Sequence, residues 1–525
     1  MTLESYDNIL IRGVNWVGDA VMTMPAIREV RRAYPEARIS LLMRPSVSPL
    51  FDHDPHIDEI IPYHDAYRGL AGKIRLARLL QQRNFSRAYL FQNAFDAALL
   101  AFLARIPERT GYRRDGRGLL LTRGISFDKP AQQMHHIDYY LNLLKLAGLT
   151  SISFSSGSNS TSALPWIYLL PEERIAARQR LQALGGPVVA LNPGAAYGSS
   201  KRWPAGRFAD VAVRFIREKD AGVIILGGPK ETGIAAEIYN RIMQRLTRTG
   251  RFDPDEMRVA DFSGRTTLRE LAALISEVDL LITNDSGPMH IGYAVRTPLV
   301  AIFGSTSPQH TGPVGKDVAL LKKDIECSPC LERECSRGDL RCMDMISAEE
   351  VFDAALRLIK TEKAVFFDRD GTLCRDAHYL SSMEDFELLP GVDELKLLRD
   401  RGFRLIGITN QSGIARGRVK EDFVREVNRI FVDRYGFDAF YYCPHHPDEH
   451  CSCRKPEPGM LYDARADYAV DLKQSFMVGD KAADMRLALT VGAAGIHVRT
   501  GQEVQSTLAD CSAADLSEVV RIICG

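Results

Sequence analysis

The sequence predicts an α/β protein that contains parallel sheets, and three observations indicate this class. Short apolar runs of strand composition alternate with helical stretches along most of the 525 residues. Several of these runs end in small or polar residues, as strands do at the edge of an open parallel sheet where ligands bind. A chain of this length is too long to fold around one hydrophobic core and suits about three domains.

The first domain is predicted over residues 1–162. A helical pattern covers residues 20–33, where Pro25 should kink or restart the helix. A Ser-rich segment of low apolar content, residues 151–162, is typical of a flexible linker or an exposed loop. The remaining strand and helix patterns of this domain are at residues 9–12, 39–43, 88–91 and 137–146.

The second domain is predicted over residues 163–361 and the third over residues 362–525. A capping-box pattern at residues 347–350 starts a helix that should reach about residue 360. Each apolar strand pattern of the second domain runs into a loop of small or polar residues, which gathers candidate ligand contacts at one sheet edge. These strand patterns are at residues 188–191, 223–226, 280–283 and 300–303.

The composition is ordinary for a globular protein, with 45% hydrophobic and 26% charged residues. Lys and Arg balance Asp and Glu at 67 each, so no overall field favours nucleic acid or an anionic membrane. The N-terminus lacks a signal-peptide pattern, and no uncharged stretch reaches the roughly 18 residues of a membrane span. We therefore expect a cytoplasmic protein whose ten cysteines are metal ligands or free thiols rather than disulfides.

A phosphoryl-transfer site is predicted at the start of the third domain. The apolar run at residues 364–367 ends abruptly in Asp368, and Asp370 follows two residues later. A carboxylate at the exposed end of a buried strand is suited to nucleophilic attack on phosphorus through an aspartyl-phosphate. Asp368, Asp370 and Asp480 would supply the oxygen ligands of a Mg²⁺ ion.

Two further elements offer groups that bind phosphate. Thr409 and Asn410 close another strand pattern, and Arg454 and Lys455 place cations that would neutralise charge on the transferred phosphoryl group. In this order, the four elements resemble the motifs of the haloacid-dehalogenase-like phosphatases over residues 363 to about 500.

This resemblance implies a Rossmann-like domain and a role for each matched residue. Asp368 would be the nucleophile and Asp370 the general acid and base, while Asp480 would bind Mg²⁺. Thr409 and Lys455 would stabilise the phosphoryl group. The interval before Thr409 is too short for a large inserted cap, so we expect an open site.

A metal-binding loop is predicted just before the two cations. It offers thiolate and imidazole ligands for a closed tetrahedral Zn²⁺ site, namely Cys443, His445, Cys451 and Cys453. A thiol-rich loop without metal is the alternative, and His446 and His450 compete with His445 as the ligand. A zinc loop here resembles the phosphatase subgroup that cleaves heptose bisphosphate and histidinol phosphate, although the spacer between the cysteine pairs is shorter.

In the first domain, Asp19 is the candidate catalytic residue. It follows Gly18 on the expected loop between the first strand and the first helix, where a carboxylate would point into a cleft between domains. A carboxylate there can deprotonate a sugar hydroxyl as a general base. A helix N-cap is the alternative role for the same side chain.

Two loops of the second domain are suited to a diphosphate. Lys201 lies in a glycine-rich loop at residues 192–204. A predicted helix start, which favours phosphate, carries Asp285, Ser286, Gly287 and His290. A solvated basic loop and an ordinary capped helix are the alternatives.

Together, three motifs resemble the ADP-heptose:lipopolysaccharide heptosyltransferases, in particular the second heptosyltransferase, over residues 8 to about 357. They are Arg-Gly-Val-Asn-Trp-Val-Gly-Asp-Ala-Val-Met-Thr-Met-Pro-Ala from Arg12, Lys-Arg-Trp-Pro from Lys201 and Asn-Asp-Ser-Gly-Pro-Met-His from Asn284. The resemblance implies a GT-B fold of two Rossmann-like domains, inversion at the anomeric carbon, no required metal and Asp19 as the general base. The implied donor-binding residues are Lys201, Asp285, Ser286, Gly287 and His290, with Glu231 as a further candidate for the ribose.

Four more cysteines form a cluster in sequence whose role stays open. Their spacing has the look of a second zinc site, and the alternative is four reduced thiols in a small packed loop. No acidic or histidine motif surrounds them, so a metal there would be structural. The cysteines are Cys327, Cys330, Cys335 and Cys342.

We therefore predict a bifunctional enzyme of the lipopolysaccharide inner-core heptose pathway. One activity would transfer heptose from ADP-heptose to the core oligosaccharide, and the other would remove the 7-phosphate of heptose 1,7-bisphosphate. The alternatives are a histidinol-phosphate phosphatase in the third domain, and a first part that binds nucleotide sugar without catalysis. Expected cofactors are Mg²⁺ and structural Zn²⁺; expected partners are the named substrates, with peripheral contact to the inner membrane face and no nucleic acid.

Overall fold

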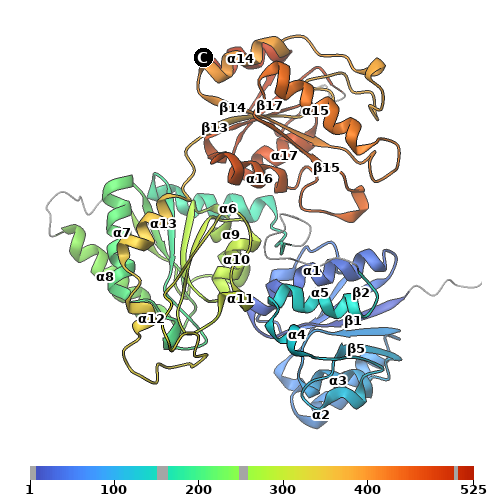
Figure 1. Cartoon of the computed structure of the whole chain (residues 1–525), viewed down its shortest axis with the longest axis vertical. Helices are drawn as coiled ribbons and strands as arrows, with labels where there is room; N and C mark the ends of the chain where they lie inside the picture. Colours follow the sequence, from blue (N-terminus) through green and yellow to red (C-terminus); the bar gives the residue numbers. More distant parts are fainter. Residues whose placement is uncertain (1–6, 151–163, 248–257, 502–505) are drawn as a thin grey trace, which may run out of the picture. The chain divides into compact units, whose positions relative to one another are not determined.

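The computed structural model describes residues 7–150, 164–247, 258–501 and 506–525. The chain forms two compact units, Met1–Leu358 (unit 1) and Ile359–Gly525 (unit 2). Within the described residues there are three six-stranded sheets, all with parallel pairing (Figure 1). The predicted α/β class is confirmed. The predicted linker at residues 151–162 lies outside the described residues, and the predicted domain bounds within unit 1 stay a prediction.

The first sheet of unit 1 has the strand order β3-β2-β1-β4-β5-β6. Both of its faces are buried: Ile9 and Ile11 belong to the core beneath α1 and α5, and Leu10 and Leu42 belong to the core beneath α2 and α3. The strands are β1 (Asn8–Arg12), β2 (Arg38–Met43), β3 (Glu59–Pro62), β4 (Arg87–Leu90), β5 (Glu108–Tyr112) and β6 (Arg123–Ile125). The helices are α1 (Val17–Ala33), α2 (Gly69–Gln81), α3 (Phe95–Leu103), α4 (Lys129–Gln133) and α5 (His136–Leu146).

The second sheet of unit 1 has the order β12-β11-β10-β7-β8-β9, which repeats the first order when its strands are numbered from β7. The strands are β7 (Val188–Asn192), β8 (Gly222–Ile225), β9 (Val259–Asp261), β10 (Leu280–Asn284), β11 (Leu299–Phe303) and β12 (Val318–Lys322). The helices are α6 (Pro171–Leu181), α7 (Ala205–Lys219), α8 (Thr232–Thr247), α9 (Leu268–Glu277), α10 (Gly287–Ala294), α11 (Pro308–Thr311), α12 (Arg341–Asp344) and α13 (Ala348–Leu356). The predicted capping box at α13 is confirmed: Ser347 Oγ accepts from Glu350 N at 3.1 Å.

One apolar core extends through both sheets of unit 1, because α1 packs against α5 and also against α10. The start of α1 approaches α10 closely at two glycines. A Cβ atom at Gly18 would lie 2.7 Å from His290 Cδ2, and one at Gly287 would lie 3.0 Å from Val17 Cγ1. These two glycines therefore permit the contact between the helix N-termini.

Unit 2 contains the third sheet, with the order β15-β14-β13-β16-β17-β18. The strands are β13 (Lys363–Phe367), β14 (Phe403–Asn410), β15 (Ala439–Cys443), β16 (Phe476–Gly479), β17 (Ala494–Val498) and β18 (Cys511–Ala513). The helices are α14 (Lys396–Asp400), α15 (Glu421–Tyr435), α16 (Gly459–Tyr468), α17 (Ala482–Val491) and α18 (Leu516–Cys524). The segment between β13 and β14 holds two short 3-10 turns and α14.

The first helix differs from its prediction. It begins at Val17 rather than Ala20 and runs past Pro25 to Ala33 without a break in its helical assignment. Proline in a helix interior costs about 3 kcal/mol, but residues 20–30 are all buried, and their packing outweighs that cost. As a result, Asp19 lies in the first turn of α1 and not on a loop.

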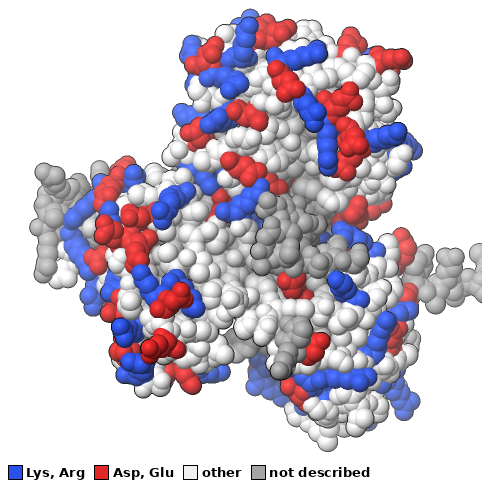
Figure 2. All heavy atoms as spheres, in the orientation of Figure 1, with Lys and Arg blue, Asp and Glu red and all other residues white. Residues whose placement is uncertain are grey.

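Charged side chains do not segregate on the visible surface. Lys and Arg are interspersed with Asp and Glu over the face drawn in Figure 2. Among the described residues, no helix combines the length and the apolar character that crossing a bilayer requires.

Candidate active sites

The candidate site of unit 2 lies where the strand order reverses. The chain passes from β13 through β14 to β15 on one side, and returns to place β16 on the other side of β13. Ligands of open parallel sheets bind at such a switch point, outside the carboxyl ends of the strands. Asp368 directly follows β13, and Asp480 directly follows β16.

Three buried carboxylates and the Lys455 ammonium form the centre of this site, and Lys481 Nζ lies at its border, 4.0 Å from Asp480 Oδ2. Asp368, Asp480 and Asp484 each offer an oxygen within 4.8 Å of the others. Lys455 Nζ lies 2.6 Å from Asp368 Oδ1 and 2.7 Å from Asp484 Oδ1. At the turn beside them, Gly371 has a φ of +95°, and a Cβ atom there would lie 2.5 Å from Asp480 Oδ2.

Burial controls the protonation of this cluster. Burial raises the pKa of Asp368, the nearby Asp484 carboxylate adds to the increase, and Lys455 opposes it. For Lys455, burial lowers the pKa, but the Asp368 and Asp484 carboxylates outweigh burial and leave the pKa raised. The lysine is therefore cationic while the carboxylates lack full compensation, and a hard divalent cation fits that donor set.

The Asp370 side chain does not join the predicted carboxylate cluster. Arg369 holds both of its oxygens at 3.0 Å, and Gln411 Nε2 donates to Oδ2 at 2.7 Å. The group of carboxylates that could hold a metal contains Asp484 in its place. The buried Arg369 guanidinium therefore holds the Asp370 side chain apart from the three carboxylates, and its role as a Mg²⁺ ligand stays a prediction.

The other predicted phosphate contacts separate into two kinds. Thr409 Oγ1 donates to Asp370 Oδ2 at 3.4 Å and so lies beside that carboxylate. The Asn410 amide instead holds the catalytic loop, since it accepts from Lys455 N at 3.0 Å and donates to Lys455 O at 3.2 Å. Arg454 has a buried Nη1 atom without a hydrogen-bond partner among the described residues, so this group is available to a ligand.

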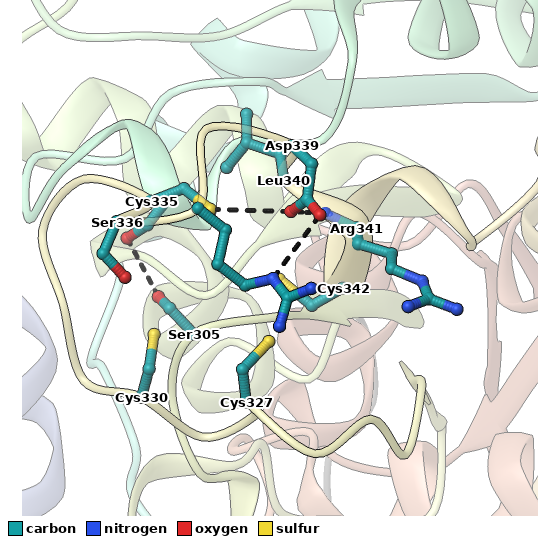
Figure 3. A pocket seen from close by; sticks show the side chains of 11 residues that line it. Ser305, Cys327, Cys330, Cys335, Ser336, Asp339, Leu340, Arg341 and Cys342 are labelled. Carbon is teal, nitrogen blue, oxygen red and sulfur yellow. Dashed lines mark hydrogen bonds and ion pairs between the residues drawn. The ribbon is translucent and has the colours of Figure 1, made fainter.

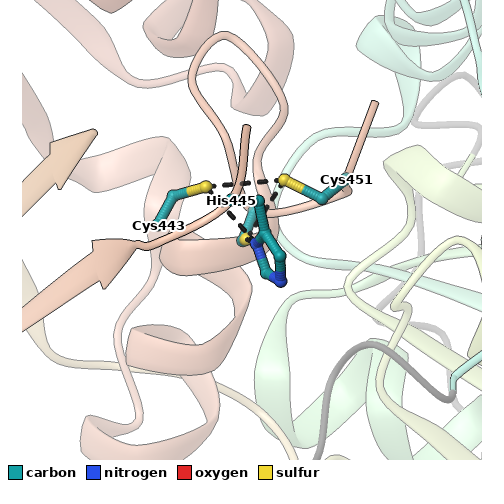
Figure 4. A group of neighbouring side chains, drawn as sticks. Cys443, His445 and Cys451 are labelled. Atoms are coloured by element: carbon teal, nitrogen blue, oxygen red, sulfur yellow. Dashed lines mark hydrogen bonds between the residues drawn. The ribbon is translucent and has the colours of Figure 1, made fainter. Parts of the chain in front are cut away.

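The predicted metal loop brings its four ligand atoms together (Figure 4). Cys443 Sγ lies 3.4 Å from Cys451 Sγ, Cys451 Sγ 3.5 Å from Cys453 Sγ, and His445 Nδ1 3.2 Å from Cys453 Sγ. A tetrahedron with Zn–S bonds of about 2.3 Å has edges of about 3.8 Å. The donor set and its spacing therefore fit a closed zinc site, and the structure selects His445 over His446 and His450.

The candidate donor site of unit 1 occupies the switch point of the second sheet, between β7 and β10. Asn192 at the end of β7 donates to Thr283 Oγ1 at 2.9 Å and to Ser286 Oγ at 2.8 Å, which ties the two strand ends together. Lys201 Nζ lies 2.5 Å from Asp285 Oδ2, and Thr306 Oγ1 donates to the same carboxylate oxygen at 2.6 Å.

The residues predicted around the helix start gather at the same place. Ser286 is the N-cap residue of α10 and makes no side-chain cap hydrogen bond. Pro288 has no N–H and Met289 N donates to Ser286 O at 3.1 Å, so Gly287 N is the donor that this first turn offers to an anion. Glu231 Oε2 accepts from Gly228 N at 2.8 Å, and its carboxylate lies against Gly194 in the loop after β7. His290 is buried beneath Gly18, and its Nδ1 lies 2.9 Å from the Tyr293 hydroxyl.

Asp19 lies near this donor site on the side of α1. Trp16 is the N-cap residue of α1, so the N-cap role considered for Asp19 is wrong. The Asp19 side chain is 31% exposed, and its Oδ1 lies 3.4 Å from His136 Nδ1 at the start of α5. Asp19 is thus accessible to a substrate and oriented by a histidine.

The sequence assigned no role to three residues of these sites. Asp484 lies in the first turn of α17, four residues after Asp480, and this spacing is a usable signal. Gln411 follows the predicted Asn410 directly. His136 received no role, because nothing in the sequence places the start of α5 beside Asp19 across the fold.

Comparison with known proteins matches unit 1 and unit 2 to different families. The family model of Glycosyltransferase family 9 (heptosyltransferase) matches residues 73–340, and a HAD-hydrolase-like model matches residues 452–521. Lipopolysaccharide heptosyltransferase 2 of Salmonella typhimurium is 29% identical over 364 residues, which is 67% of this chain and 99% of that protein. D-glycero-β-D-manno-heptose-1,7-bisphosphate 7-phosphatase of Photorhabdus laumondii is 40% identical over 179 residues, which is 30% of this chain and 95% of that protein.

A solved structure supports the fold of unit 1. Escherichia coli ADP-heptose lipopolysaccharide heptosyltransferase II matches with a TM-score of 0.55 and 25% identity over 67% of this chain and 98% of that one. The predicted pair of Rossmann-like domains in a GT-B arrangement, followed by a HAD-like domain, is confirmed. The chain therefore belongs to glycosyltransferase family 9, the heptosyltransferases, and its C-terminal part belongs to the HAD-like heptose-bisphosphate phosphatases.

Proposed function

We propose that the chain is a bifunctional enzyme of lipopolysaccharide inner-core heptose metabolism. Unit 1 transfers heptose from ADP-heptose to the core oligosaccharide, and unit 2 hydrolyses the 7-phosphate of D-glycero-D-manno-heptose 1,7-bisphosphate. The observation that carries this conclusion is that relatives of each activity match a different unit, and each unit holds its own polar site at a sheet switch point.

In unit 2, we assign the nucleophile to Asp368. Its carboxylate attacks phosphorus, the bond to the sugar oxygen breaks, and Asp370 gives the leaving oxygen a proton. Asp370 then removes a proton from water, which attacks the aspartyl-phosphate and releases phosphate. Lys455 fixes Asp368 for attack through the 2.6 Å contact, while Thr409 and Arg454 contact the phosphorylated substrate.

Mg²⁺ would be held by the Asp368 and Asp480 carboxylates together with Asp484, and it would neutralise charge on the phosphoryl group when bound. The Zn²⁺ ligands are Cys443, His445, Cys451 and Cys453. That ion has a structural role, since its loop leads directly into Arg454 and Lys455.

In unit 1, we assign the general base to Asp19. It takes the proton of the acceptor hydroxyl, whose oxygen attacks the anomeric carbon as the bond to ADP breaks, with inversion. Lys201 and the α10 N-terminus, from Ser286 to Gly287, stabilise the diphosphate that leaves. Asp285 orients Lys201 through the 2.5 Å ion pair, and His136 orients Asp19.

Two further residues complete the proposed donor site. Glu231 is assigned to the ribose because its carboxylate lies over the loop after β7. His290 supports the first turn of α1 from below.

We place both reactions in the cytoplasm, with peripheral contact to the inner membrane face where the lipid-linked acceptor is presented.

Two single substitutions in the full-length chain test which unit carries which activity. Asp368→Asn should lower phosphate release by roughly 10³-fold or more and leave heptosyl transfer unchanged. Asp19→Asn should lower transfer by roughly 10²- to 10⁴-fold and leave phosphate release unchanged. Asp324→Asn, at a fully exposed side chain, is the matched control and should alter neither rate.

The same assays decide the phosphatase substrate. Wild-type enzyme should turn over heptose 1,7-bisphosphate faster than histidinol phosphate. Faster cleavage of histidinol phosphate would refute the substrate assignment, and full transfer by Asp19→Asn would refute the proposed base.

A further inference from the structure

The end of β17 contacts two turns of the phosphatase site in unit 2. His497 lies on β17, where it is the register partner of Gly479 on β16. Its Nε2 lies 3.2 Å from the backbone oxygen of Asp480. Because a carbonyl oxygen can only accept, Nε2 carries the proton and donates to that oxygen. This hydrogen bond fixes the peptide group that joins Asp480 to Lys481.

A second hydrogen bond extends from the same strand end to the other turn. Thr500 Oγ1 donates to the backbone oxygen of Gly371 at 2.8 Å. Gly371 lies in the turn that follows Asp368, after β13. Strand β16 lies between β13 and β17 in the sheet. Thr500 therefore holds a turn that belongs to a strand with which its own strand does not pair.

Two glycines let these segments pack closely against one carboxylate. A Cβ atom at Gly371 would lie 2.5 Å from Asp480 Oδ2, and a Cβ atom at Gly501 would overlap the same side chain. The Asp480 carboxylate is thus enclosed between the turn after β13 and the loop after β17. Its orientation depends on where these two segments lie.

The burial of His497 indicates that the residue is present for its donor. The side chain is fully buried, and Nδ1 has no hydrogen-bond partner among the described residues. Burying a polar atom without a partner costs free energy, and an apolar side chain at this position would avoid that cost. A histidine here is therefore explained by the hydrogen bond that it donates to the Asp480 oxygen, and not by packing.

The strand end is itself anchored from its other side. Strand β17 pairs with β18 as well as with β16. Beyond the strand, Arg499 N donates to Ala513 O at 3.0 Å. The segment from His497 to Thr500 therefore has a fixed base from which its side chains reach the two turns.

We propose that His497 and Thr500 are positioning residues of the phosphatase site. They hold the two turns so that the Asp368 and Asp480 carboxylates keep the spacing that a divalent cation requires. Both act through main-chain oxygens and take no part in proton transfer. This inference deepens the proposed function and rests on the assignment of the phosphatase reaction to unit 2.

Calorimetric titration of Mg²⁺ alone into the full-length chain tests the inference without turnover, and Asp480→Asn gives the background from other sites. Thr500→Val and His497→Met remove the donors at similar side-chain size. Each should raise the Kd for Mg²⁺ about tenfold or more, since groups that hold metal ligands contribute roughly 10–100-fold to metal affinity. Thr490→Val is the matched control, because it removes a hydroxyl that donates at 2.8 Å to Arg486 O within α17, and it should leave the Kd unchanged.

Conservative variants separate the hydrogen bonds from the packing. Thr500→Ser keeps the hydroxyl, and His497→Gln keeps an N–H close to the position of Nε2. Both should bind Mg²⁺ within about threefold of the wild type. An unchanged Kd in both Thr500→Val and His497→Met would overturn the proposal, and so would equal weakening in the conservative and the non-conservative variants.

Phosphate release distinguishes positioning from a general loss of structure. In Thr500→Val, the Mg²⁺ concentration that gives half the maximal rate should rise, and kcat should recover at saturating Mg²⁺. The KM for heptose 1,7-bisphosphate should change by less than about twofold. A kcat that Mg²⁺ does not restore would overturn the proposal. Absence of phosphate release by the wild type would instead refute the proposed function and leave the Mg²⁺ titrations to decide this inference.

Hydrogen exchange of the wild type needs no substitution at either residue. Coupling between two sites is reciprocal, so a segment that strengthens Mg²⁺ binding should itself be stabilised by Mg²⁺. Peptides that end at residue 501 should gain protection when Mg²⁺ is added, and Asp480→Asn should lack this gain. No added protection in the wild type at saturating Mg²⁺ would overturn the proposal.

Discussion

Two histidines of unit 1 are held neutral by the fold. His290 packs beneath Gly18, and His135 Nε2 lies 3.0 Å from Gly312 O. Burial lowers the pKa of each imidazole to about 4. Both residues border the contact between α1, α5 and the second sheet, so their charge state bears on the integrity of the proposed transfer site.

Unit 1 should lose stability as the pH falls. The folded pKa of about 4 lies below the ordinary value of 6.5, so between these values the unfolded chain binds more protons than the folded one. Each histidine should then cost about 3 kcal/mol by pH 4 relative to neutral pH. Urea unfolding at a series of pH values, followed by tryptophan fluorescence, measures this effect, because Trp16, Trp166 and Trp203 all lie in unit 1.

The contribution of His290 can be isolated by substitution. His290→Gln should flatten the pH dependence, while His64→Gln, at an exposed position, should reproduce the wild-type slope. A slope for His290→Gln equal to that of the wild type would contradict the assignment.

At the scale of elements, the site of unit 1 depends on how closely α1 and α10 approach. A Cβ atom at Gly18 would lie 2.7 Å from His290 Cδ2, a distance that real contacts do not show. The contact joins the two Rossmann-like halves of the unit, since α1 belongs to the first sheet and α10 to the second. Adding even a methyl group at Gly18 should therefore change the distance between α1 and α10.

Gly18→Ala should destabilise unit 1 by about 1–3 kcal/mol, because helix packing must shift to admit the methyl group. Gly233→Ala in the first turn of α8 is the control, since a Cβ atom there meets nothing within 4 Å. That change should be neutral or slightly stabilising. Urea midpoints read by tryptophan fluorescence compare the two variants, and equal midpoints would show that the close approach does not matter.

The cysteine loop of unit 2 links another element to catalysis. Cys451→Ser should remove one zinc ion per chain and lower phosphate release about tenfold or more, because Lys455 follows the loop directly. Metal analysis and phosphatase assays on the same sample test this, with heptosyl transfer as the internal control. Full phosphatase activity after loss of the ion would show that the loop does not position Lys455.

At the scale of the whole molecule, the chain divides into two units with separate cores and separate sites. The three sheets share one strand order, which gives each sheet a switch point with polar side chains beside it. Ligands of one site should therefore stabilise the unit that binds them.

Mg²⁺ should stabilise unit 2 selectively. At 100 times its Kd, a ligand adds about 2.7 kcal/mol to the unit it binds. Hydrogen exchange followed by mass spectrometry should show added protection of β13 and β16, whereas the tryptophan-detected unfolding of unit 1 should not move. Asp480→Asn should abolish the added protection. An equal gain in stability of both units on addition of Mg²⁺ would contradict a site confined to unit 2.

Much of the site chemistry was predictable because it follows a local rule. Polar residues that end apolar strands meet at one edge of a parallel sheet, and this rule located Asp368, Asp480 and Asp285. The cysteines of the predicted metal loop, Cys443, Cys451 and Cys453, follow from donor type and spacing, whereas the choice of His445 needed the structure. The limits of the rule appear at Asp370, which leaves the carboxylate cluster because the buried Arg369 holds it.

The sequence by itself determined the α/β class and the strand-end residues, since periodicity, turn residues and ligand spacing are local properties. The two families came from the resemblance of its motifs to known proteins. Only the tertiary structure decided that Asp484 completes the carboxylate cluster, that α1 continues past Pro25, and that His136 faces Asp19. It also placed the four cysteines Cys327, Cys330, Cys335 and Cys342 around one cavity that Ser200 helps to line (Figure 3). These features depend on contacts between segments far apart in the chain, whose packing energies outweigh local propensity.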